Sequence, residues 1–520
     1  VYGYPAFSNT TYVQWDAGAM GGISDGGGDW SATNKWWNGA TNQNWADNLD
    51  AVIGNYGVPG TITVTNTSPQ FNSLTLNPVA YGNYGLTGNP LRIASGTINA
   101  NAATTISNNI TGLAALAKNG IATLTLAASN NFPGVAAINQ GTVKVSHPNA
   151  LGTSSAVIQS GATLDINGQS LGNGRGSLIV AGNGVGGNGA IINSGATQIQ
   201  AMTNLAMTAD TTVSTVNTWH LRSNPASGLD MGGHTLTKIG GNQLYIQLWP
   251  GLVQNPGNVI VSNGNFMIGF NTWTGSGATN TMTFHSGTTF QIYKGSANYV
   301  FSTVLNGATL LFSPEAAFTG NWTGGIALSG TSTIKAETNV TLNGVISGSG
   351  NLVKTGTGTL TLGGTNTYYG TTTVSNGTLR VANANFAPNS TIAVATNSVL
   401  QLNLAVTNTI ANLVLNGVSQ PLGVYGSNNT AYITGPGSLR VGTAIPTTPT
   451  NLNYAYSNNV LTLSWPANYL GWSLQAQTSS LAVGLSTNWF TLPGSALVTS
   501  TNFYISTTNA AVFYRLFYQP

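Results

Sequence analysis

The sequence predicts an all-β protein whose largest part is a solenoid of stacked strands. Three observations lead to this prediction. A strand motif recurs along the chain, short apolar strands alternate with Gly or Asn, and charged residues make up only 4% of the 520 positions. Together they favour coils that stack on one another over an ordinary globular enzyme.

The recurring motif is Lys-x-Gly-x-x-x-Leu-x-[Leu/Ile], and its lysines are Lys118, Lys238 and Lys354. Each copy is followed, at a nearly constant spacing, by a glycine that opens another strand: Gly141, Gly264 and Gly377 respectively. Such a period indicates units that bury their apolar edges only against their neighbours. We expect the periodic lysines to cap backbone carbonyls at the corners or to keep a solvated face on a nearly uncharged surface.

One copy resembles a known family. The stretch from Gly348 to Ala384 contains Gly-Ser-Gly-Asn-Leu-Val-Lys-Thr-Gly-Thr-Gly-Thr-Leu-Thr-Leu and then Thr-Tyr-Tyr-Gly-Thr-Thr-Thr-Val-Ser-Asn-Gly-Thr-Leu. It is similar to the autotransporter-associated β-strand repeat of secreted bacterial surface proteins, and the other two copies are degenerate versions of it. The resemblance implies a right-handed parallel β-helix that is exported, and so a secreted, extracellular or cell-surface location. It implies no catalytic activity.

Composition narrows the classes of function. Charged residues are 4% of the chain, where about 25% is usual, while 41% of residues are hydrophobic, which argues against a disordered chain. The 13 basic and 10 acidic residues are scattered, so we expect no nucleic-acid partner. No apolar run reaches the ~20 residues that cross a bilayer, so no membrane insertion is expected. The absence of cysteine fits export without oxidative folding.

Residues 1–58 are predicted to be an N-terminal extension and cap. They hold Trp15, Trp30, Trp36, Trp37 and Trp45. We expect these rings to cover the first coil, because its unpaired backbone and apolar interior would otherwise face water. The alternative is a sugar-stacking site, for which Trp36 and Trp37 are the candidate residues.

Residues 59–443 are predicted to be the parallel β-helix with its degenerate repeats. Strands of three to five residues with period-two alternation and Gly or Asn corners suit three-sided coils. Coils of ~22 residues would give about 17 of them, with amide side chains forming ladders from coil to coil.

A Pro/Thr linker at 444–451 precedes a small C-terminal module at 452–520. Six or seven short strands there predict a β-sandwich similar to fibronectin type III domains, with Arg515 as its single charged side chain. Regular alternation would place Tyr514 and Tyr518 on the row opposite Phe513 and Phe517.

The search for chemistry gives weak candidates. Asp210 and Asp230 are separated by nearly one coil length, and they are the one carboxylate pair that a polysaccharide lyase or hydrolase could use. His220 and His234 flank Asp230 without good metal-ligand spacing. The stretch from Asp25 to Asp29 could hold calcium, although a plain turn is favoured. We therefore expect no enzyme activity, no cofactor and no metal.

The leading hypothesis is a non-catalytic extracellular structural protein whose copies assemble head to tail into bacterial surface or matrix filaments. The segment before residue 15 is aromatic and uncharged and could add as a strand to a neighbouring copy. Candidate assembly residues are Tyr2, Tyr4, Phe7, Tyr12, Val13, Trp15, Tyr514 and Tyr518. The alternative is a monomeric surface adhesin that binds cell-surface or matrix polysaccharide.

Overall fold

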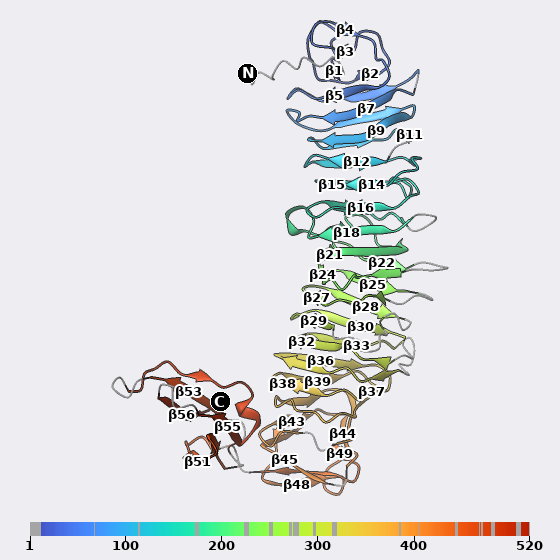
Figure 1. Ribbon diagram of the computed structural model, residues 1–520. Coiled ribbons are helices and arrows are strands. Elements are labelled where there is room, and N and C mark those ends of the chain that lie inside the picture. The colour runs from blue at the N-terminus through green and yellow to red at the C-terminus, as the bar shows by residue number, and fades with distance from the viewer. Residues whose placement is uncertain are drawn as a thin grey trace. The chain divides into compact units, whose positions relative to one another are not determined.

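The computed structural model confirms the all-β prediction: the chain forms a parallel β-solenoid of about 15 coils, with an aromatic cluster near its N-terminus. It falls into two compact units, Val1–Thr303 and Val304–Pro520. Figure 1 shows short strands stacked coil upon coil within each unit. The structure describes residues 12–66, 68–112, 115–171, 176–222, 228–248, 253–269, 273, 280–294, 298–314, 320–383, 386–404, 406–442, 446–466, 469, 472–479, 484–505 and 511–518.

Alternation along each strand creates the core. In the strand Thr123–Leu126, Leu124 and Leu126 are buried while the two threonines are half-buried, and the same pattern recurs in the next coil at Val143 and Val145. Parallel pairing puts Leu124 beside Val143 and Val143 beside Leu164, so aliphatic side chains stack on one another through the interior. Each coil thereby buries its apolar row against its neighbours.

Coil length varies in a way that composition alone does not reveal. Leu124 pairs with Val143 in the next coil, and Leu164 pairs with Ile191 in the next coil. The second of these pairs is separated by more residues, so that coil is the longer one. Longer coils of this kind account for about 15 coils in place of the predicted 17.

The first unit opens with β1 (Tyr12–Trp15), β2 (Gly28–Asp29), β3 (Trp36–Trp37) and β4 (Asn42–Gln43). One ladder continues from β1 through β5 (Leu49–Ile53), β7 (Gln70–Leu76), β9 (Leu91–Ala100), β12 (Leu116–Asn119), β14 (Ala136–Ile138), β16 (Ala156–Ile158), β18 (Leu178–Gly182), β21 (Asn204–Ser214), β23 (Gly228–Asp230) and β26 (Val253–Gln254). A second holds β6 (Thr61–Val64), β8 (Tyr84–Gly88), β10 (Thr104–Ile106), β13 (Thr123–Leu126), β15 (Thr142–Val145), β17 (Thr163–Asp165), β19 (Ile191–Ile192), the far end of β21, β24 (Leu236–Ile239), β27 (Val259–Val261) and β29 (Thr281–Phe284).

A third ladder of this unit contains β20 (Gln198–Met202), β22 (Trp219–Arg222), β25 (Gln243–Gln247), β28 (Asn265–Gly269) and β30 (Thr289–Tyr293). The remaining elements are β11 (Ile110–Gly112), η1 (Val185–Gly187) and β31 (Asn298–Tyr299), and β32 (Ser302–Asn306) spans the boundary of the two units.

In the second unit, one ladder holds β33 (Thr309–Phe312), β36 (Thr331–Ala336), β39 (Asn351–Thr355), β41 (Thr372–Val374), β43 (Thr391–Val394), β46 (Asn412–Leu415) and β47 (Val418–Ser419). Another holds β34 (Asn321–Trp322), β37 (Val340–Leu342), β40 (Thr359–Leu362), β42 (Gly377–Val381), β44 (Ser398–Leu402) and β49 (Ile433–Thr434). β35 (Ile326–Ser329) pairs with β38 (Ile346–Gly348), and β50 (Ser438–Val441) lies between β45 (Thr407–Ile410) and β48 (Gly423–Gly426).

The predicted amide ladders are present on the outside of the first unit. The Nδ2 of Asn119 donates to Oδ1 of Asn99 (3.3 Å), and the Nδ2 of Asn139 donates to Oδ1 of Asn119 (2.9 Å). Such side chains let a nearly uncharged surface satisfy its polar groups from coil to coil.

The solenoid ends in antiparallel strands. β47 pairs antiparallel with β46, and β48 pairs antiparallel with β50. These short reversals interrupt the parallel stacking of the last coil, which is a common way to blunt an exposed sheet edge.

The C-terminal module consists of two three-stranded antiparallel sheets in its described residues. One holds β51 (Asn453–Ser457), β52 (Val460–Ser464) and β55 (Ser500–Tyr504); the other holds β53 (Ser473–Thr478), β54 (Phe490–Thr491) and β56 (Val512–Phe517), and η3 (Ser495–Leu497) precedes β55. Leu463, Trp465 and Leu474 form a buried cluster that joins residues of both sheets. The likeness to fibronectin type III domains stays a prediction.

Candidate functional sites

The recurring lysines are buried and act as clamps. Their exposed fractions are 1% for Lys118 and 0% for both Lys238 and Lys354. Each ammonium group donates to three backbone carbonyls at 2.5 to 2.9 Å. The predicted capping of corner carbonyls is thus confirmed, and the alternative of a solvated face is wrong. An ammonium has three donors and no acceptor, so three carbonyls match it fully.

The clamps join neighbouring coils. Two acceptor carbonyls of each lysine follow it closely in the chain, and the third belongs to the next coil, at Gln140, Asn263 or Asn376. Each lysine also occupies a core position that is aliphatic in the coils before and after: Ile98 and Ile138 flank Lys118, Val213 and Val261 flank Lys238, and Ile334 and Val374 flank Lys354. The stem therefore packs in the core while the charge reaches the corner.

The clamp also explains the repeat's glycines. Gly141 follows the acceptor Gln140, has φ of +63°, and a Cβ there would lie 2.5 Å from the Nζ of Lys118. Gly377 has φ of +68°, and a Cβ there would lie 2.5 Å from the carbonyl oxygen of Gly356, another acceptor. Only glycine gives both the left-handed backbone and the space that the clamp needs.

Burial lowers the pKa of Lys118 and of Lys354 to about 8 and that of Lys238 to about 7, because each amine leaves water. Amines with such pKa values can act as nucleophiles when a substrate reaches them. Here the amines are covered and their N–H groups donate to backbone carbonyls, so the clamps are structural.

The aromatic cap accounts for several sequence candidates. Trp15 and Val13 on β1 are buried, at 0% and 1% exposure, and the ring of Trp15 packs edge to face on that of Trp36, with centroids 5.4 Å apart. Trp36 is also 0% exposed, and its Nε1–H donates to the carbonyl of Trp30 (3.0 Å). Its ring centroid lies 4.6 Å from that of Trp30 and 4.8 Å from that of Trp45. Trp36 therefore packs inside the cap and cannot stack on a sugar.

Two other candidates of the cap region remain near the surface. Trp37 and Tyr12 are half-buried, as expected from alternation with their buried neighbours. Tyr2, Tyr4 and Phe7 lie outside the described residues.

The acidic segment of the cap is satisfied by the protein itself. The Oδ1 of Asp25 accepts from the hydroxyl of Tyr84 (2.7 Å) and from the backbone N–H of Asn55 (3.0 Å), and its Oδ2 accepts from the N–H of Gly57. These donors occupy the oxygens that calcium would need. Over the part of the chain that the structure describes, no three His, Cys, Asp or Glu side chains come together as a metal site.

Asp210 and Asp230, the candidate lyase pair, have separate partners. Strand pairing places Asp230 beside Ala206, not beside Asp210. The Oδ1 of Asp230 accepts from the N–H of Gly232 (2.9 Å) and from Nδ2 of Asn255 (3.0 Å), while the Oδ1 of Asp210 accepts from the N–H of Thr235 (2.8 Å). The two carboxylates are therefore engaged with different partners, which gives no support to shared acid and base roles.

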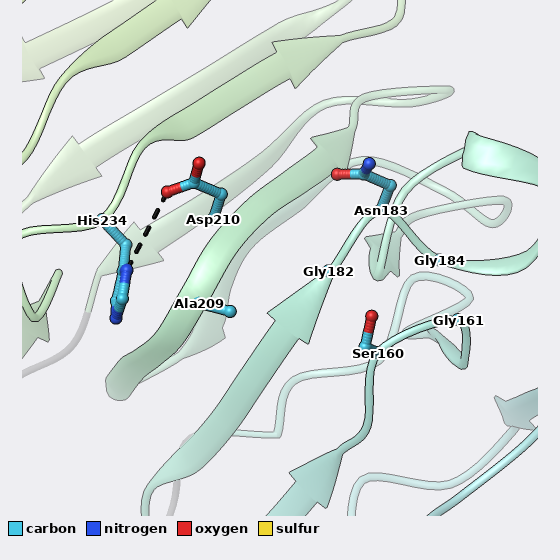
Figure 2. Close-up of a pocket in the computed structure, with 8 residues that line it drawn as sticks. All are labelled: Ser160, Gly161, Gly182, Asn183, Gly184, Ala209, Asp210 and His234. Carbon is cyan, nitrogen blue, oxygen red and sulfur yellow. Dashed lines mark ion pairs between the residues drawn. The ribbon is translucent and has the colours of Figure 1, made fainter.

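Asp210 instead lies near His234 in a pocket of about 540 Å³. Its Oδ1 is 3.9 Å from the Nδ1 of His234, too far for a hydrogen bond, and 74% of the Asp210 side chain is exposed. Figure 2 shows Ser160 and Asn183 across the strand from His234, with no nucleophile directed at the imidazole among the residues drawn. This open pocket lacks the convergent groups of a catalytic site.

The remaining histidine of interest, His220, is buried against Tyr245, with ring centroids 5.0 Å apart. Burial lowers the pKa of His220 to about 4, so it is neutral at ordinary pH. It is on β22, away from the corner of His234, so the suggested zinc constellation does not form among these residues.

In the C-terminal module the tyrosine candidates are half-buried and lie on the face that packs on the core. Tyr514 packs on the buried cluster and against Phe503 (centroids 4.9 Å apart), and Tyr518 stacks on Trp472 (5.4 Å). They do lie on the row opposite Phe513 and Phe517, as predicted, but theirs is the inner row.

Sequence reasoning missed the exposed aromatic side chains of this module. Tyr454 and Tyr456 on β51 are 78% and 56% exposed, and Tyr504 on β55 is 74% exposed. Tyr454 and Tyr456 are two residues apart, so the sequence places them on the same face of a strand. Whether that face meets water depends on how the two sheets pack.

Two segments of the chain, residues 116–145 and 352–381, match the family described as the passenger-associated-transport-repeat. Each contains one complete lysine clamp with its glycine. The Lys238 clamp lies outside both segments, and its ammonium likewise donates to three backbone carbonyls, one of them in the next coil. Comparison with curated proteins and with solved structures gave no match. The repeat implies a secreted or surface-exposed protein. Over the described residues, no helix has the length and hydrophobicity needed to cross a bilayer.

Proposed function

We propose, starting from its two passenger-associated transport repeats, that this is an extracellular passenger-domain protein whose solenoid is a non-catalytic structural element. We further propose that copies assemble head to tail into bacterial surface or matrix filaments. The observation that carries the assembly is an exposed aromatic edge strand in the C-terminal module.

That edge strand is β51. It pairs only with β52 among the described strands, so one side of its backbone has free N–H and C=O groups. All five of its residues are exposed, including Tyr454 and Tyr456. An exposed edge with large side chains and no charge is a template for an added strand.

The added strand would come from residues 1–11 of another copy. This segment carries no charge and contains Tyr2, Tyr4 and Phe7. It leads into β1, which is already paired on both sides by β3 and β5 and so has no free edge of its own. Eleven extended residues span about 36 Å at most, more than twice the length of a five-residue strand.

Such a contact joins two different surfaces and so can continue indefinitely. A heterologous contact that does not close by rotation produces an open fibre. The scarcity of charge, 4% of residues, leaves little repulsion between packed copies.

The test is deletion of residues 1–11, with assembly followed by electron microscopy and by light scattering at several concentrations. Deleting 1–14 would also remove Val13 from the core of the cap, so the shorter deletion is required. We expect fibres from the full chain and isolated particles from the deletion variant and from Tyr454→Lys.

Tyr81→Lys is the matched control, since Tyr81 is 67% exposed in the first unit. It should assemble normally. Fibres that persist after the deletion, or that are lost equally in the Tyr81 variant, would refute strand addition at β51.

The non-catalytic role has its own test. Acidic and neutral polysaccharides incubated with the protein should show no cleavage. Cleavage that is abolished by Asp210→Asn would contradict the proposal and restore the lyase alternative.

A further inference from the structure

We propose that a polar groove in the second unit binds an acidic polysaccharide, with Arg380 holding the carboxylate of a uronic acid residue. The groove has a volume of about 400 Å³ and lies on the ladder of β37, β40, β42 and β44. This function is independent of filament assembly and adds a ligand to the structural role.

The groove is built on one row of outward side chains. Parallel pairing aligns Thr341 with Thr361, Thr361 with Arg380, and Arg380 with Gln401. All four line the groove. Because the strands are about 4.8 Å apart, close to the length of one sugar unit, an extended polysaccharide can place successive residues over successive strands.

Arg380 is the one charged residue in the described lining of the groove. Its Nε is buried and has no hydrogen-bond partner among the described residues. A guanidinium is always charged and offers its donors in a planar fork that matches a carboxylate, and a buried donor without a partner is costly. Because Nε is closed to a ligand, a carboxylate in the groove would accept charge-assisted hydrogen bonds from the Nη groups at the end of the guanidinium.

The other lining groups suit a sugar better than a peptide. Threonine hydroxyls come from three positions, and amides come from Asn339 and Gln401. The Oδ1 of Asn339 accepts from the N–H of Thr359 (3.0 Å), which leaves its NH₂ group as a donor. Val340 is the only large apolar residue in the described lining, so there is no hydrophobic pocket for a peptide side chain.

The unit that contains the groove carries the net positive charge of the chain. The second unit holds five basic and two acidic residues by sequence, whereas the first holds eight of each, so the net charge of +3 belongs to the unit with the groove. The described acid closest in sequence to the groove lining, Glu337, is paired with Lys335 at 2.8 Å, and that hydrogen bond lowers the pKa of Glu337. The described lining contains no Asp, Glu, His or Lys, so it is a binding site and has no groups for catalysis.

The experiment is calorimetric titration of the full chain with polygalacturonate, a polymer of uronic acid, and with neutral dextran. We expect binding of polygalacturonate only. Arg380→Gln should weaken it at least tenfold, and Thr361→Val, which removes one hydroxyl from the groove, should weaken it severalfold. Circular dichroism and the melting temperature check that each variant remains folded.

Arg440→Gln is the matched control, because Arg440 is an exposed arginine on β50 of the same unit and outside the groove. It should bind as the unchanged protein does. The proposal is overturned if the full chain does not bind polygalacturonate, if both arginine variants lose the same affinity, or if dextran sulfate binds as tightly with the same dependence on Arg380, which would indicate attraction to any polyanion.

Discussion

Replacing Lys354 by methionine tests whether the lysine clamp holds adjacent coils together. Methionine keeps an unbranched apolar stem in the stack between Ile334 and Val374, but it cannot donate to the carbonyls of Thr355, Gly356 and Asn376. The substitution therefore removes the clamp without leaving a large cavity.

The size of the effect follows from the contacts. Hydrogen bonds from a charged donor contribute about 1.5–3 kcal/mol each, so three give a gross loss of about 4.5–9 kcal/mol. Removing the buried ammonium recovers several kcal/mol of its desolvation. A net destabilisation of about 2–4 kcal/mol remains, and it acts locally because stability in a solenoid is a sum of terms between neighbours.

Native-state hydrogen exchange on peptides covering 351–381 is the suitable assay, because it reports local opening. A loss of about 2–4 kcal/mol corresponds to about 30-fold to 700-fold faster exchange. Lys335→Met is the matched control, since Lys335 lies one coil earlier on β36 with its side chain 43% exposed. Its exchange should change by less than about twofold. Equal protection in Lys354→Met and the unchanged protein would refute the clamp.

Two further predictions concern the same motif. Raising the pH from 7 to 9.5 should raise the melting temperature. The folded chain releases the proton of Lys238 near pH 7, whereas the unfolded chain keeps it to pH 10.5, so the unfolded state binds more protons in this window and stability rises with pH. Lys238→Met should remove part of this rise; a fall in the melting temperature of the unchanged protein that Lys238→Met abolishes would contradict the predicted sign. In thermal unfolding, Gly377→Ala should be more destabilising than Gly417→Ala by about 1–3 kcal/mol. Both glycines have positive φ, but a Cβ at position 377 would meet the acceptor carbonyl of Gly356, whereas one at position 417 would meet nothing within 4 Å. Equal losses of stability would show that backbone strain alone matters.

Short-range pattern was enough to predict the solenoid and part of its clamp. The burial pattern of β39 puts Leu352 and Lys354 inside and Val353 outside, which is the alternation that the sequence predicts for a strand. A lysine in phase with core leucines was therefore a readable signal of a buried amine. Its interpretation as a carbonyl cap, with a solvated face as the alternative, rested on the recurrence of the lysine in the repeat.

The sequence by itself determined the class of fold, the repeat and the strands, because these depend on residue type and on spacings no longer than one repeat. Only the tertiary structure decided which of Trp36 and Trp37 is sealed in the cap, that Asp210 and Asp230 have different partners, and that Arg380 lines a groove with Thr361 and Gln401. These outcomes depend on the register between coils, and coil length differs from one pair of strands to another within the first unit. A side chain in a solenoid meets residues one coil away, so its surroundings become known only when every coil length is fixed.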